Sequence, residues 1–121
     1  MDREDSLREI ADRLAVLTLS EEDLEFDFVL DQLTGLKEEI RNLAVVASDT
    51  DAPMVAWLQD EHVRGMVLYA AAQSNLRSQR ALGLAAPYDP ATRAGITSQF
   101  GSWAAAARAE VLRILGDDRL G

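Results

Sequence analysis

Cysteine is absent from this chain of 121 residues, and histidine occurs only once. Without thiolates there is neither a disulfide framework nor a nucleophilic cysteine, and one histidine is too few for the usual zinc ligand sets. The Glu-x-x-His pair that builds di-iron sites in helical bundles does not occur, nor does any glycine-rich phosphate-binding motif. The sequence therefore predicts a non-catalytic protein without metal or cofactor.

Long hydrophobic runs are also absent. The longest nearly apolar stretch, residues 65–72, is far shorter than the roughly 20 residues that span a bilayer. The N-terminus is acidic and passes directly into an amphipathic pattern, whereas a signal peptide needs a basic start and an apolar core. We therefore expect a cytoplasmic protein without a membrane segment. The preference for arginine over lysine and the abundance of alanine suggest a prokaryotic source.

Basic charge is scarce relative to acidic charge, with 12 Lys and Arg against 21 Asp and Glu and a net charge of −9. Direct nucleic-acid binding and attachment to anionic lipid both need clustered cations, so neither is expected. Residues 1–61 contain 17 acidic and 5 basic residues, whereas residues 62–121 contain 4 and 7. This acidic first half predicts a docking face for a basic protein partner.

Apolar residues recur at alternating steps of three and four along most of the chain, which is typical of amphipathic helices. The clearest stripe comprises Phe26, Val29, Leu33, Leu36, Ile40, Leu43 and Ala47. Four helices are predicted, near residues 7–18, 21–47, 53–82 and 90–115. Short connectors between helices favour antiparallel neighbours. A chain of 121 residues is long enough to form one hydrophobic core. We therefore expect a single all-α domain over residues 1–121, an up-down antiparallel bundle of one shorter and three long helices.

The helix ends are predicted from capping residues. Ser6 and Glu9 have the spacing of a capping box, and Ser20 offers a second cap followed by three carboxylates. Pro53 and Pro90 suit the first turns of the third and fourth helices. The predicted C-terminal stops of these two helices are Gly83 and Gly116.

The third predicted helix is apolar on more than one side, which is typical of a helix covered by several neighbours or by another subunit. Its best stripe comprises Val55, Leu58, His62, Met66, Tyr69, Gln73 and Leu76. Trp57, Val63 and Val67 lie off this stripe and are the candidate contacts with a second chain. The candidate residues for a basic partner are Glu21, Glu22, Asp23, Asp27 and Asp31. We expect a homo-oligomer, most simply a dimer.

His62, followed by Arg64 and Gly65 in a small acidic helical protein, resembles the phospho-accepting site of histidine-phosphotransfer domains. That family places the basic residue three positions and the glycine four positions after the histidine, so both come one position early here. His62 also shares a helix face with Leu58 and Met66, which favours a structural histidine. Burial of His62 would exclude phosphotransfer.

The sequence favours a small acidic, non-catalytic protein–protein interaction module, that is an adaptor, inhibitor or assembly subunit that self-associates. A histidine-phosphotransfer-like domain that uses His62 is one alternative. Another is an acidic nucleic-acid mimic that blocks a DNA- or RNA-binding protein, which requires the acids of the first two helices to form one continuous surface. A small-molecule binder would need a cavity near Trp57, Tyr69 or Trp103.

Overall fold

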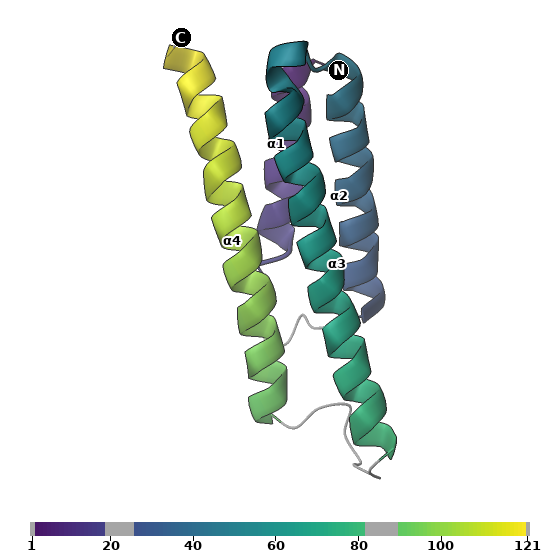
Figure 1. Cartoon of the computed structure of the whole chain (residues 1–121). Coiled ribbons are helices and arrows are strands. Elements are labelled where there is room, and N and C mark those ends of the chain that lie inside the picture. The colour runs from purple at the N-terminus through teal and green to yellow at the C-terminus, as the bar shows by residue number, and fades with distance from the viewer. Residues whose placement is uncertain (1, 19–25, 82–89, 121) are drawn as a thin grey trace.

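The computed structural model describes residues 2–18, 26–81 and 90–120. In this part of the chain, α1 (Arg3–Val16), α2 (Phe26–Val46), the short 3₁₀ helix η2 (Asp49–Asp51), α3 (Ala52–Ala81) and α4 (Pro90–Leu120) follow one another, without a strand. The helices alternate in direction, and α3 and α4 extend beyond the N-terminal end of α2 (Figure 1). The predicted all-α up-down bundle is confirmed.

The four helices form a ring in which each packs against two neighbours. α1 contacts α2 and α4, and α3 also contacts α2 and α4, with the fewest contacts between α3 and α4. Within the described ranges, no helix is both long and apolar enough to cross a bilayer.

The predicted stripe of α2 supplies a continuous part of the core. Its buried members are Val29, Leu33, Leu36, Ile40 and Leu43. Leu36, Ile40 and Leu43 join the core cluster with most of α1, whereas Val29 and Leu33 join a second cluster with Tyr69 and Phe100. The first member of the stripe has a side chain outside the described part, and the last follows the end of α2. Periodicity thus identified the buried side of this helix correctly.

The start of α1 differs from the predicted capping box. Asp2, not Ser6, is the N-cap, because its side chain accepts a hydrogen bond from the Asp5 N–H at 2.8 Å. Ser6 already lies inside the helix, where its N–H donates to Asp2 O at 3.1 Å and its side chain is buried. The earlier start lets Arg3 donate to Asp51 Oδ2 at 2.9 Å, which joins the beginning of α1 to η2. Asp and Ser are about equally good N-cap residues, so local chemistry does not choose between Asp2 and Ser6. The start at Asp2 is the one that also forms the Arg3–Asp51 ion pair.

Four other predicted boundaries need comment. The first helix ends at Val16 instead of residue 18, because its last turn tightens into hydrogen bonds that span three residues. α4 continues through Gly116 to Leu120, since this glycine keeps a helical backbone and provides no left-handed stop. The predicted start near Glu21, the cap at Ser20 and the stop at Gly83 lie outside the described residues.

Candidate functional site

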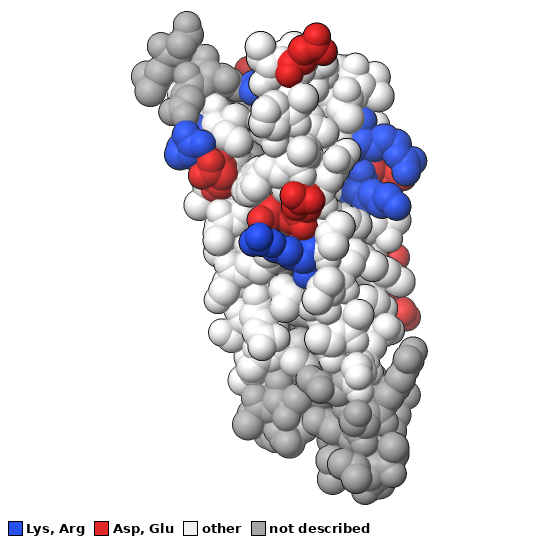
Figure 2. All heavy atoms as spheres, in the orientation of Figure 1, with Lys and Arg blue, Asp and Glu red and all other residues white. Residues whose placement is uncertain are grey.

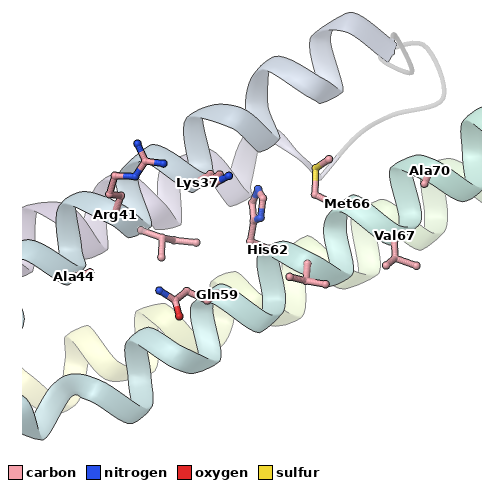
Figure 3. A pocket seen from close by; sticks show the side chains of 10 residues that line it. Lys37, Arg41, Ala44, Gln59, His62, Met66, Val67 and Ala70 are labelled. Carbon is pink, nitrogen blue, oxygen red and sulfur yellow. The ribbon is translucent and has the colours of Figure 1, made fainter.

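A groove of about 710 Å³ lies between α2 and α3. Both helices contribute side chains to it (Figure 3). The lining residues are Lys37, Ile40, Arg41, Ala44, Gln59, His62, Val63, Met66, Val67 and Ala70. The groove exists because small alanines and outward-reaching cations occupy positions where larger apolar side chains would close the seam. Its size is within the range of ligand sites, and its walls are mainly apolar.

His62 connects the two walls of the groove. Its Nε2 lies 3.0 Å from Leu33 O, and because a carbonyl oxygen only accepts, Nε2 must carry the proton and donate it. Burial lowers the pKa of His62 below its ordinary value of 6.5; the hydrogen bond to Leu33 opposes this effect, and the charge of Lys37 adds to it. The ring is half-buried, and the lowered pKa favours its neutral form. This geometry gives Nε2 a structural partner, and phosphotransfer stays an untested prediction.

Two of the candidate interface residues, Val63 and Val67, lie along the outer edge of the groove. They are one helical turn apart and keep 58% and 62% of their surface exposed. The stretch of α3 from residue 65 to 74 contains no charged residue. Figure 2 shows a largely uncharged surface on this side of the molecule, interrupted by a few groups of charged side chains. The geometry therefore brings these two valines together as an exposed apolar edge, as a docking surface requires.

The third candidate, Trp57, lies on the other side of α3 and is partly buried against the core cluster. Beside it, Trp103 of α4 fills the seam, and its indole Nε1 donates to Glu61 Oε2 at 2.9 Å. A Cβ added at Gly65 would lie 2.5 Å from Trp103 Cη2, so this glycine forms the notch that receives the indole. Gly65 therefore has a packing role here, independent of the phosphotransfer pattern that drew attention to it.

Smaller hollows lie near the tryptophans. One of about 460 Å³ is lined by Trp57, Arg3 and Asp51 among others, and one of about 240 Å³ lies between Trp57 and Trp103. The Arg3 guanidinium beside Asp51 lowers the pKa of that carboxyl, although burial opposes the shift. The small-molecule alternative thus has cavities near its predicted positions, but the larger groove lies on the opposite side of α3.

The predicted acidic face is only partly visible. Asp27 and Asp31 are exposed on α2, whereas Glu21, Glu22 and Asp23 lie outside the described residues. Cations stand among the acids that are described, since Arg8 pairs with Glu4 on α1 and Arg41 pairs with Glu38 on α2. In the ranges with placed side chains, no group of three or more His, Cys, Asp or Glu is arranged to hold a metal ion.

Sequence reasoning missed the two cations of the groove, Lys37 and Arg41. They were counted only within the strongly acidic first half, where five basic residues are outnumbered by acids. Their spacing of four, together with Ala44 three positions later, places them on the side of α2 next to the core position Ile40. This spacing could have predicted a basic edge beside the apolar seam.

No protein-family model matches the chain, and comparisons with curated proteins and with solved structures give no significant match.

Proposed function

We propose that this protein is a non-catalytic protein–protein interaction module that docks its partner on the groove between α2 and α3 and on the adjoining outer side of α3. We call this surface the α3 docking face. It comprises Lys37, Arg41, Val63, Met66, Val67 and Ala70. The observation that carries the proposal is the exposure of Val63 and Val67 side by side at the edge of an open apolar groove.

The physical argument is that covering this face removes apolar surface from water. Burying a valine completely contributes about 1.5 kcal/mol, so two valines and the groove floor would provide a useful part of a binding energy. Lys37 and Arg41 at the edge favour a partner with carboxylates beside its apolar contact. The predicted basic partner concerns the outer acids Asp27 and Asp31, and it stays a prediction. We also retain the cytoplasm of a prokaryotic cell as the proposed setting.

The proposal can be tested by photo-crosslinking inside the cells that make the protein. A photoreactive phenylalanine is introduced at Val67 and, as a matched control, at Leu112 of α4, which is 42% exposed outside the docking face. We expect an adduct of one defined mass from position 67 and none from position 112. The same adduct should weaken when Lys37 and Arg41 are both replaced by glutamate. Absence of an adduct at position 67, or equal adducts at both positions, would overturn the proposal.

A further inference from the structure

Four exposed charged side chains of α2 are placed symmetrically about its middle, with aspartates before Thr34 and cations after it. Glu38, which is also exposed, pairs with Arg41 within the same copy and lies outside this pattern. Asp27 and Arg41 each lie seven residues from Thr34, and Asp31 and Lys37 each lie three residues from it. All five side chains are exposed. When two such helices lie antiparallel with their Thr34 residues opposed, every aspartate meets a cation and every cation meets an aspartate.

The exposed apolar edge of α3, formed by Val63 and Val67, is also symmetric about a central residue. That residue, Gly65, lies at the same height along the bundle as the middle of α2. A Cβ at Gly65 would lie 3.0 Å from Leu33 Cδ2, so Gly65 stands beside the middle of α2, next to Thr34. Val63 and Val67 each lie two residues from Gly65. A two-fold axis that passes near Thr34 and Gly65 therefore brings Val63 against the partner's Val67 while it aligns the charges of α2.

We propose that the partner on the α3 docking face is a second copy of this chain, bound antiparallel about that two-fold axis. The inference rests on the proposed function, because it assigns an occupant to the same surface. Asp27 pairs with the partner's Arg41, Asp31 with the partner's Lys37 and Val63 with the partner's Val67, and the symmetry makes each contact twice. Leu30, which is 37% exposed, lies between the two aspartates and adds apolar surface to the contact.

The charge of the chain also selects this arrangement over others. Two copies that each carry a net charge of −9 repel one another in most orientations. Lys37 and Arg41 are the cations of α2, so the antiparallel register is the one that places both against aspartates of the second copy. Since these groups are exposed, added salt screens their attraction and leaves the valine contacts in place.

A charge-swap experiment tests the inference directly. Variant A carries Lys37→Asp and Arg41→Asp, and variant B carries Asp27→Lys and Asp31→Lys. Sedimentation velocity from 10 to 200 µM should show a dimer for the wild type and at least tenfold weaker association for A or B alone. An equimolar mixture of A and B should restore a dimer, because all four positions become complementary again, and this restoration shows that both variants are folded.

A cross-linking test locates the axis. The natural chain has no cysteine, so a single Thr34→Cys substitution should form an intermolecular disulfide under mild oxidation, since the axis places the two Thr34 residues opposite each other. Val16→Cys on the exposed side of α1 is the control and should cross-link at least tenfold less. Equal cross-linking of the two variants would overturn the assigned axis.

The outcomes separate this inference from the proposed function. A wild type that stays monomeric to 200 µM, or a mixture of A and B that does not associate while the wild type does, refutes the two-fold arrangement. If position 67 then still yields its defined adduct with a different protein, the docking face stands and only its occupant changes. If the wild type is monomeric and no adduct forms, both proposals fail.

Discussion

The two flanks of α3 are built in opposite ways. Toward α4, the Trp103 indole fits a notch at Gly65 and bonds to Glu61, so it fills the middle of the seam and leaves only a hollow of about 240 Å³ beside it. Toward α2, alanines and charged side chains leave a groove of about 710 Å³. α2 and α4 flank α3 in the same way within the ring of helices. The difference between the two seams therefore lies in the size and polarity of the side chains that line them. Both flanks of α3 contribute to the fold, since α2 and α3 pack closely beneath the groove, and the two flanks differ at their outer edges. The outer edge toward α2 is the one that is open to a partner.

The largest change in stability is expected when the indole is removed from the seam between α3 and α4. We expect Trp103→Ala to lower the free energy of unfolding by about 3 kcal/mol, at the low end for a large aromatic because the indole is half-buried. Urea unfolding followed by circular dichroism measures the change. Trp103→Phe keeps most of the ring and loses the bond to Glu61, and it should lose only about 1 kcal/mol. Equal losses for the two variants would contradict a seam filled by the indole.

Overfilling the same flank should have the next largest effect. Gly65→Ala places a methyl group 2.5 Å from the indole, and we expect a loss of about 1–2 kcal/mol although alanine is the better helix former by about 1 kcal/mol. The same urea titration applies. In the Trp103→Ala background, most of this loss should disappear, and the contact with Leu33 Cδ2 at 3.0 Å is what remains. Gly101→Ala is the matched control, because an added Cβ there meets nothing within 4 Å, and it should stabilise the protein by up to about 1 kcal/mol.

On the open flank, His62 should make stability depend on pH. Its pKa in the folded protein lies below 6.5, so its contribution is complete above pH 6.5 and is lost as the pH falls through the folded-state pKa. Between pH 7.5 and 5.5, the free energy of unfolding should fall further in the wild type than in His62→Gln. The difference between the two should be smaller than the losses expected for Trp103→Ala and Gly65→Ala. Because histidine occurs once, NMR can follow the ring directly. A midpoint above 6.5 would contradict the assigned burial and hydrogen bond.

The smallest effect is expected from filling the open flank. Ala70 lines the groove and is exposed, so Ala70→Leu should change the free energy of unfolding by no more than about 0.5 kcal/mol. Urea unfolding of this variant beside Gly65→Ala makes the comparison within one helix. A loss of more than 1 kcal/mol in Ala70→Leu would mean that this flank is as closely packed as the other.

The periodic part of the fold could be predicted from the sequence. The positions from Val29 to Leu43 are buried as their spacing predicts, because a helix of 3.6 residues per turn brings them to one side. Val63 and Val67 were found as surplus apolar residues for the same reason. On α4, Ala104 is fully buried, whereas the indole of the preceding Trp103 lies across the seam with α3.

Other features depended on choices that the sequence leaves open. Asp2 and Ser6 are both good caps, and the observed start also brings Arg3 to Asp51. At Gly95 and Gly101 of α4, an added Cβ would meet nothing within 4 Å. Gly65 receives the Trp103 indole, and Gly35 receives the Arg13 guanidinium. Which glycine lies opposite a large side chain depends on how two helices are rotated and shifted against each other.

The helices, the buried side of α2 and the acidic balance follow from the sequence alone, because helical periodicity and charge are properties of neighbouring residues. Tertiary packing was needed to bring Trp103 into the seam between α3 and α4, to place Lys37, Arg41 and His62 in one groove with Val63 and Val67, and to set Leu33 against Gly65. These relations join residues far apart in the chain. They follow from the rotation and level of packed helices, which local spacing does not specify.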